Sequence, residues 1–230
     1  MAIHTTPELL PASVIERAKK LSPALLADGM KGLGIPVDGC MDTSILPVDP
    51  SMKVVGTAFT VETQDGDNFP VHVATYSGGS GYVMVIDGKG YDKRAYLGGL
   101  IAGAAKAVGY EGIVCDGYVR DREGLVEMEF PVYARGLMQG GPEKKGPGNV
   151  NGPITCGGIP VAPGDLIVGD ADGVTVVPRE RIAEILDNAE KKLAYELDRT
   201  ATIAAYVEAK RTGGKLPELA PKWVLDMLKS

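Results

Sequence analysis

Apolar and polar positions follow two periods along the chain, and together they predict a mixed α/β fold. β-Branched and apolar residues alternate over residues 52–64, which is typical of a strand. Two continuous apolar runs, residues 81–90 and 111–117, end in Asp and Gly and predict buried strands. The small-residue stretch 95–110 between them predicts a helix that ends near Gly109. Strand, helix and strand in this order indicate a right-handed βαβ unit with parallel strands.

The N-terminal part of the chain carries helical spacing with a break. Residues 12–30 predict two short helices, the second with Ser22 as its N-cap and Pro23 at its first position. For residues 69–78 the period does not decide between a helix and a strand.

The C-terminal half predicts further strands and then a helical arm. Residues 130–136 read as a short strand and residues 137–155 as a polar loop rich in Gly and Pro. Residues 159–178 predict two short strands joined by "GDADG", a sequence typical of a β-hairpin turn. We therefore divide the chain into a body, residues 1–178, and a helical C-terminal arm, residues 179–230, that packs on its own body or on a neighbouring subunit.

Composition and charge narrow the class of protein. The 230 residues carry a formal net charge of −6 and no basic stripe, so we expect no nucleic-acid partner. No apolar run approaches membrane-spanning length, and the first residues lack the features of a secretory signal. The three cysteines, Cys40, Cys115 and Cys156, are far apart and fit a reducing cytoplasm.

Two glycines precede the helix of the βαβ unit. With Gly98 and Gly99 at its start, the amides of Gly99, Leu100 and Ile101 have no helical partners and could bind a carboxylate or phosphate. Tight packing of the helix on a strand would explain the glycines equally well.

Charged residues follow the strands of this unit on the same side. Asp87 ends the first strand, and Asp116, Arg120 and Asp121 lie at the end of the next. Because ligands collect beyond the carboxyl ends of parallel strands, these groups and Gly98 are expected to converge. Convergence favours a binding site over a solvated turn.

The residue types suit a 2-oxo acid. Asp121 is a hard oxygen ligand fit for Mg²⁺, and Arg120 can clamp a carboxylate or stabilise an enolate oxygen. Metal and arginine together would favour carbon–carbon bond cleavage next to a carbonyl. A solvated Arg-Asp turn pair is the alternative.

The stretch "AYLGGLIAGAAKAVGYEGIVCDGYVRDREGL", together with "FPVYARG", resembles the RraA-like family. "TVETQDGDN" and "GDLIVGDADGVTVVP" also match, and the resemblance covers roughly residues 21–194. The family contains class II 4-hydroxy-4-methyl-2-oxoglutarate/4-carboxy-4-hydroxy-2-oxoadipate aldolases and smaller regulators of ribonuclease E. The resemblance implies a swivelling β/β/α domain that assembles as a homotrimer or homohexamer with active sites between subunits.

The resemblance also implies roles for the residues already singled out. A divalent metal, Mg²⁺ or Mn²⁺, would be held through Asp121, and Arg120 would lie at the pyruvyl group. The backbone amides around Gly98, Leu100 and Ile101 would bind the pyruvyl carboxylate.

A glutamate from a neighbour's C-terminal helix completes the metal shell in the aldolases. Glu196 is the best match to it and Glu190 the second, although either could be part of a solvated helix face.

The chain departs from the aldolase pattern at two positions. Gly124 stands where the pattern has an acid, with Glu123 beside it, and Gly99 stands where some aldolases carry an aspartate. The catalytic base is then a metal-bound water or another acid, such as Asp87, Asp116 or Glu123.

The resulting hypothesis is a cytoplasmic class II aldolase of aromatic catabolism. It would release pyruvate from a 4-hydroxy-2-oxo di- or tricarboxylic acid and would also decarboxylate oxaloacetate. Arg135, Lys144 and Lys145 could bind the far carboxylate or belong to a solvated loop. The alternatives are an enzyme for a different oxo acid and a non-catalytic regulator that binds ribonuclease E.

Overall fold

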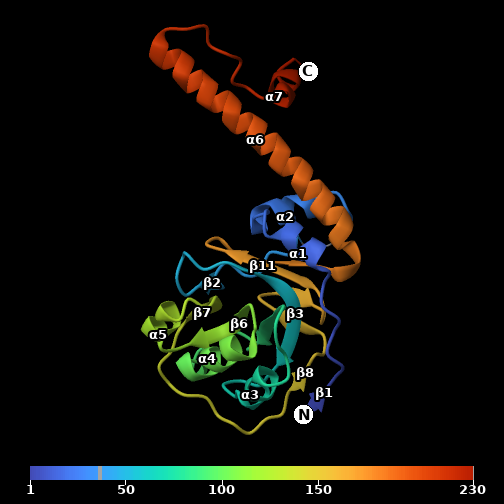
Figure 1. The fold of residues 1–230 in the computed structure, drawn as a ribbon, viewed down its shortest axis with the longest axis vertical. Coiled ribbons are helices and arrows are strands. Elements are labelled where there is room, and N and C mark those ends of the chain that lie inside the picture. The colour runs from blue at the N-terminus through green and yellow to red at the C-terminus, as the bar shows by residue number, and fades with distance from the viewer. Residues whose placement is uncertain (36–37, 230) are drawn as a thin grey trace.

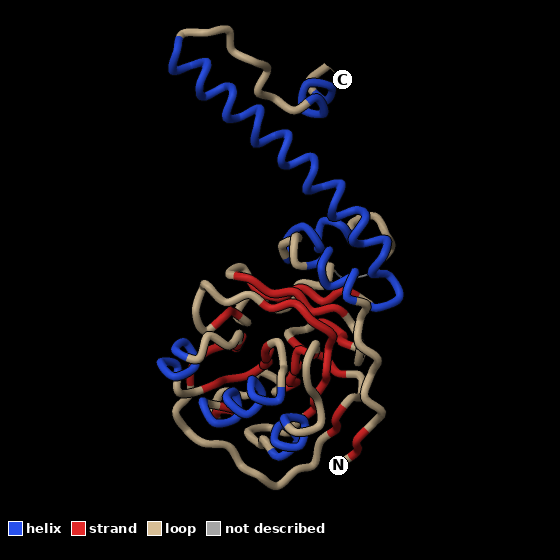
Figure 2. Tube along the Cα trace, viewed as in Figure 1, coloured by secondary structure: helices blue, strands red, loops and turns tan. Residues whose placement is uncertain are grey.

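The body of the protein is built on one large mixed sheet (Figures 1 and 2). The structure, a computed structural model, describes residues 1–35 and 38–229. Within these residues the sheet has ten strands, seven of them in the order β1-β8-β3-β4-β6-β7-β2. β11 and β12 extend it from β3, and β5 pairs with β6. The strands are β1 (Ala2–Ile3), β2 (Leu46–Pro47), β3 (Val54–Glu62), β4 (Tyr82–Asp87), β5 (Ala95–Leu97), β6 (Gly112–Val119), β7 (Val132–Leu137), β8 (Asn149–Val150), β11 (Leu166–Asp170) and β12 (Gly173–Val177).

The predicted βαβ unit is present at the centre of this sheet. β4 and β6 are parallel neighbours, with Met84 opposite Ile113, and α4 (Gly99–Val108) connects them. Gly109 caps the helix in the left-handed conformation (φ 107°), as expected of a C-terminal glycine.

One expectation for this unit is wrong. The helix does not begin at Ala95, because residues 95–97 form β5, in which Ala95 pairs with Tyr118 and Leu97 with Val119. Tertiary pairing with β6 therefore overrides the helical character of this stretch.

Two helices cover one face of the sheet. The stretch 69–78, for which the sequence did not decide between helix and strand, contains the helix α3 (Phe69–Thr75), with Pro70 in its first turn. α3 and α4 pack buried side chains such as Val71 and Ile101 against Phe59 and Met84. The other face is covered by the small antiparallel sheet of β9 (Ile154–Cys156) and β10 (Ile159–Val161).

The polar loop expected over residues 137–155 is shorter in the structure. Leu137 ends β7, residues 149–150 form β8 against β3, and β9 begins at Ile154. The loop interpretation missed these pairings because two- and three-residue strands carry too little alternation to be recognised. The expected hairpin is present as β11 and β12.

The two expected N-terminal helices are α1 (Ala12–Ala18) and α2 (Pro23–Met30). Ser22 caps α2 through its hydroxyl, which accepts a hydrogen bond from Leu25 N at 3.2 Å. α2 packs on the first turns of the long C-terminal helix, where Ile185 and Leu186 are fully buried.

The C-terminal arm consists of the short 3₁₀ turn η1 (Arg179–Arg181), the long helix α6 (Ile182–Thr212) and the short helix α7 (Lys222–Met227). α6 projects away from the body (Figure 1). No residue of α6 beyond Ala189 is buried, and Leu197, Val207 and Trp223 are 59–62% exposed. Packing of this arm on a neighbouring subunit stays a prediction. Among the described residues no helix combines the length and the hydropathy needed to cross a bilayer.

Candidate active site

The predicted aspartate lies where β6 ends, beside the first turn of α4. Asp121 adopts the left-handed conformation (φ 63°, ψ 42°), in which residues other than glycine are uncommon and which aspartate tolerates. Its Oδ2 accepts a hydrogen bond from Gly99 N at 3.0 Å. The expectation that the Gly99 amide is free for a ligand is therefore wrong, because this amide already binds a carboxylate of the chain itself.

The predicted arginine lies next to it and is only loosely engaged. Arg120 N donates to Leu97 O at 3.0 Å, which ties the end of β6 to β5. The guanidinium Nε lies 3.8 Å from Asp121 Oδ2, and the two side chains are 43% and 51% exposed. At this distance and exposure the ion pair is weak, so most guanidinium donors remain free for a ligand.

A cleft of about 130 Å³ brings most of the predicted site together. Gly98, Leu100, Ile101, Arg120 and Asp121 all line it. The start of the helix and the Arg-Asp pair therefore converge as expected, whereas Asp87 and Asp116, expected at the same place, are not among the lining residues. The roles of these residues stay predictions.

The two glycines at the start of α4 are not equivalent. A Cβ on Gly98 would overlap Asp121 Oδ2 and lie 2.8 Å from Arg120 Cγ. A Cβ on Gly99 would meet only Asp121, at 3.8 Å or more, which is ordinary contact. Gly98 is therefore required for the approach of the Arg-Asp pair, and Gly99 is not.

A distant loop closes one side of the cleft through a buried carboxylate. Asp67, 4% exposed, accepts hydrogen bonds from the backbone amides of Phe69, Lys145 and Gly146 at 2.6–3.2 Å. These bonds hold the loop before β8 against the start of α3 and bring Lys144 to the cleft. No local pattern in the sequence announces this contact.

Five further residues line the cleft, and sequence reasoning considered only Lys144 among them. It missed Asn68, His72, Leu97 and Pro142. Burial lowers the pKa of His72, with a further contribution from the charge of Lys144, so its imidazole is neutral near pH 7. Lys144 is exposed and forms no hydrogen bond or ion pair with the described residues. The cleft therefore combines the loosely paired Arg120 and the exposed Lys144 with a neutral histidine.

Arg135, considered for the far carboxylate, belongs to a different structure. Its Nε donates to Asp116 Oδ1, and its Nη1 donates to Ser44 Oγ at 2.7 Å. Gly157 N donates to Asp116 Oδ2 at 2.7 Å, so both carboxylate oxygens are occupied. Neither Asp116 nor Arg135 is among the residues lining the cleft. Lys145 is likewise paired, with Glu143 at 3.1 Å.

The other two acids considered as bases also lie outside the cleft lining. Burial raises the pKa of Asp87 to about 6, and its Oδ1 accepts a hydrogen bond from Lys89 N. Glu123 is exposed in the first turn of α5 (Arg122–Glu127).

The two arm glutamates differ in their surroundings. Glu190 forms an ion pair with Arg17 at 2.7 Å, a contact that fixes α6 to α1. Glu196 is exposed, and its carboxylate has no partner among the described residues. It lies on the part of α6 that projects from the body, whereas α4 and α5 lie in the lower part of Figure 1. Within one chain, Glu196 and Asp121 therefore do not meet.

A divalent cation would fit the donor set of the cleft. Among the described residues no three His, Cys, Asp or Glu side chains gather as a metal site, and Asp121 is the sole carboxylate in the cleft lining. Mg²⁺ is commonly held by one or two carboxylates, with water and substrate oxygens completing the shell. Asp121 matches this need, because Gly99 N orients Oδ2 and the half-exposed side chain leaves Oδ1 open.

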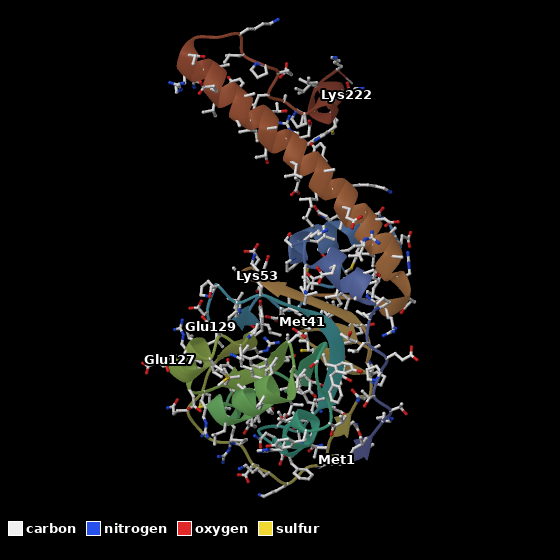
Figure 3. The ribbon with its side chains drawn as sticks, viewed as in Figure 1. Met1, Met41, Lys53, Glu127, Glu129 and Lys222 are labelled. Carbon is white, nitrogen blue, oxygen red and sulfur yellow. The ribbon has the colours of Figure 1, made fainter. Side chains whose placement is uncertain are left out.

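A larger hollow of about 520 Å³ lies elsewhere, between α1–α2 and the β3–β11 region. Its charged side chains include Lys19, Lys20 and Lys53, the last of which Figure 3 labels beside β11. The start of α2 lies there, but Ser22 already caps it, and the two carboxylates in the lining, of Glu111 and Asp170, accept hydrogen bonds from backbone amides. The smaller cleft is therefore the better candidate.

The fold and the cleft define an α/β domain with a mixed sheet, and the candidate site lies beyond the carboxyl ends of its central parallel strands. The family model described as RraA-like, Aldolase/RraA, matches residues 24–176, and the chain belongs to this family.

Comparisons with individual proteins agree with this family assignment. A protein of Halalkalibacterium halodurans named "Putative 4-hydroxy-4-methyl-2-oxoglutarate aldolase" is 40% identical over 86% of this chain and 91% of that protein. A crystal structure of an uncharacterized protein from Pseudomonas syringae pv. tomato has a TM-score of 0.71 at 29% identity, covering 92% of this chain and 97% of that one. The RNA-processing inhibitor RraA from Thermus thermophilis has a TM-score of 0.56 at 30% identity, covering 60% and 84%.

Proposed function

We propose that the protein is a divalent-metal-dependent aldolase that releases pyruvate from a 4-hydroxy-2-oxo di- or tricarboxylic acid. The observation that carries this proposal is the single cleft lined by the start of α4, the loosely paired Arg120 guanidinium and the Asp121 carboxylate. The names of relatives such as the H. halodurans protein support the substrate class.

The start of α4 and Arg120 bind different parts of the pyruvyl group. The free amides of Leu100 and Ile101, with the positive end of the helix dipole, bind the carboxylate. Arg120 donates to the keto oxygen and stabilises the negative charge that it acquires as the C3–C4 bond breaks. Lys144 attracts a carboxylate at the other end of the substrate.

Cleavage requires that the C4 hydroxyl lose its proton. The electron pair of that O–H bond forms the new carbonyl, the C3–C4 pair becomes the enolate, and C3 then takes up a proton to give pyruvate. Neutral His72 is the proton acceptor that the cleft lining offers, because the open Oδ1 of Asp121 is the atom that would hold the metal. Loss of CO₂ from oxaloacetate gives the same enolate, so decarboxylation is expected as a side activity.

Asp121 would hold the divalent ion, Mg²⁺ or Mn²⁺, with Glu196 contributed by the arm of a neighbouring subunit. Bound there, the ion supplies Lewis acidity to the keto oxygen. The exposed arm supports a homotrimer or homohexamer, in which each arm reaches another subunit's cleft. As part of the same proposal we place the enzyme in the cytoplasm.

The proposal is tested by coupling pyruvate release to lactate dehydrogenase. We expect turnover of one or more 4-hydroxy-2-oxo acids and of oxaloacetate with Mg²⁺ or Mn²⁺. We expect EDTA to abolish aldol cleavage and added metal to restore it. Full activity in EDTA would exclude the metal-dependent mechanism, and no pyruvate from any substrate would exclude the aldolase.

A regulator of ribonuclease E is the second candidate, because the fold matches the RNA-processing inhibitor RraA. The chain extends beyond that similarity, which covers 60% of it. Inhibition of purified ribonuclease E by a protein that releases no pyruvate would favour this function.

A further inference from the structure

Asp67 fixes the backbone of the loop on one side of Lys144. Its carboxylate is 4% exposed and accepts hydrogen bonds from Lys145 N at 2.6 Å and from Gly146 N at 3.2 Å. Both amides lie in the loop that joins β7 to β8, 78 and 79 positions further along the chain. Because a buried carboxylate without donors is costly to the fold, these two amides are held firmly in place.

The residue on the other side of Lys144 is held as well. Glu143 N donates to Gly66 O at 2.8 Å, and Asn68 N donates to Glu143 O at 3.0 Å. The backbone of Lys144 therefore lies between two anchored residues, although the loop around it is polar and rich in Gly and Pro.

The same contacts leave the Lys144 side chain available. Glu143, the acid next to it, already pairs through Oε1 with Arg94 at 3.3 Å and through Oε2 with Lys145 at 3.1 Å. The Lys144 ammonium has no hydrogen bond or ion pair with the described residues, and its charge contributes, after burial, to the lowered pKa of His72 in the cleft. An anchored backbone that carries an unpaired cation reduces the entropy lost when a carboxylate of a ligand binds there.

We propose that Asp67 is a positioning residue for substrate selection. By holding Lys144 at the cleft, it makes the enzyme prefer 4-hydroxy-2-oxo acids that carry a second carboxylate. The inference rests on the proposed aldolase function and extends it to a buried residue that does not line the cleft. Because an ion pair with Lys144 takes no part in bond breaking, the effect of Asp67 should lie in KM and not in kcat.

The test compares two substrates that differ in one group. C5 is a carboxylate in 4-hydroxy-2-oxoglutarate and a methyl group in 4-hydroxy-2-oxopentanoate. Lys144→Met should lower the ratio of kcat/KM for the first substrate over the second about fivefold, the size of one exposed ion pair. Asp67→Asn should lower this ratio about threefold through KM, because its Nδ2 takes the place of Oδ2 and cannot accept from Lys145 N.

Two comparisons separate positioning from a general effect on the fold. The double variant of Asp67→Asn and Lys144→Met should have the ratio of Lys144→Met alone, because its loop has no cation left to position. The matched control is Asp165, which is 4% exposed, accepts hydrogen bonds from Ala162 N at 2.8 Å and Arg179 N at 3.0 Å, and does not line the cleft. Asp165→Asn should keep the wild-type ratio, whatever its effect on the melting temperature.

A second variant and a binding measurement repeat the comparison. Asp67→Ser keeps an acceptor for the nearby Phe69 N but is too short to reach the loop amides, so its ratio should fall at least as far as that of Asp67→Asn. Calorimetry in the presence of Mg²⁺ measures the dissociation constants of 2-oxoglutarate and 2-oxopentanoate, which again differ only in a terminal carboxylate and methyl group. The first constant should rise about threefold relative to the second in Asp67→Asn.

Additive losses in the double variant would overturn the inference, as would an equal loss of the ratio in Asp165→Asn. Wild-type ratios in both Asp67 variants would overturn it too, and so would a fall in kcat that is the same for both substrates. Failure of the aldolase proposal itself would instead appear in the wild-type protein, as absence of pyruvate from either substrate.

Discussion

Two arginine–aspartate pairs lie at the ends of neighbouring strands, and they are built in opposite ways. Arg135 and Asp116 form a closed pair with side chains 20% and 8% exposed, and a further hydrogen bond from Gly157 N occupies the second carboxylate oxygen. Arg120 and Asp121 are adjacent in the sequence, lie 3.8 Å apart at their nearest charged atoms and are about half exposed. Only the second pair lines the cleft.

The difference shows how local backbone geometry leaves charges available. In the closed pair, the guanidinium approaches the carboxylate from a neighbouring strand and neutralises it. In the open pair, the left-handed turn at Asp121 directs the carboxylate to Gly99 N, which leaves Arg120 without a strong partner. The closed pair therefore stabilises the fold, and the open pair is free to bind a ligand.

The largest effect is expected at the open pair. Arg120→Ala should lower kcat/KM for pyruvate release about 1000-fold, because an unshielded donor to a developing oxyanion is lost. The melting temperature should change little, since the Arg120 side chain makes no strong contact. Arg122, exposed on α5 and outside the cleft lining, is the matched control, and Arg122→Ala should keep wild-type kinetics. Equal effects of the two substitutions would contradict the assignment.

Substitution in the closed pair should lower the free energy of unfolding. Arg135→Met leaves the buried Asp116 carboxylate without its cation, which typically costs about 3 kcal/mol of unfolding free energy. Urea denaturation at pH 7 measures this loss, and Arg120→Met is its control, with an expected change under about 1 kcal/mol. If Arg135→Met were as stable as the wild type, the distinction between a structural and a functional pair would fail.

Alanine substitutions at the two glycines that begin α4 should differ in their effect on activity, because only one of the two positions has room for a Cβ. Gly98→Ala forces a Cβ into the Asp121 carboxylate and should lower kcat/KM about 100-fold, because a displaced catalytic group loses its alignment. Gly99→Ala meets only ordinary contacts and should stay within about threefold of the wild type. Similar kinetics for the two variants would show that the approach of Asp121 to Gly98 is not needed for activity.

Sequence reasoning predicted the central architecture and the open pair. The period of apolar residues identified β4, α4 and β6, and Ser22-Pro23 located the start of α2. Because parallel strands end at one edge, the order of elements was enough to bring Gly98 and Arg120 together. It went wrong at Ala95, where pairing with β6 outweighs local helical character.

The sequence by itself determined the βαβ unit, the glycines at the start of its helix and the arginine–aspartate pair, because each depends on residues close together in the chain. Only the tertiary structure decided the rest of the cleft. Asp67 binds the amide of Lys145, 78 positions away, and so brings Lys144 to Asn68 and His72. Such a contact forms because a buried carboxylate must find donors wherever the fold supplies them, and no local pattern specifies which amides those will be.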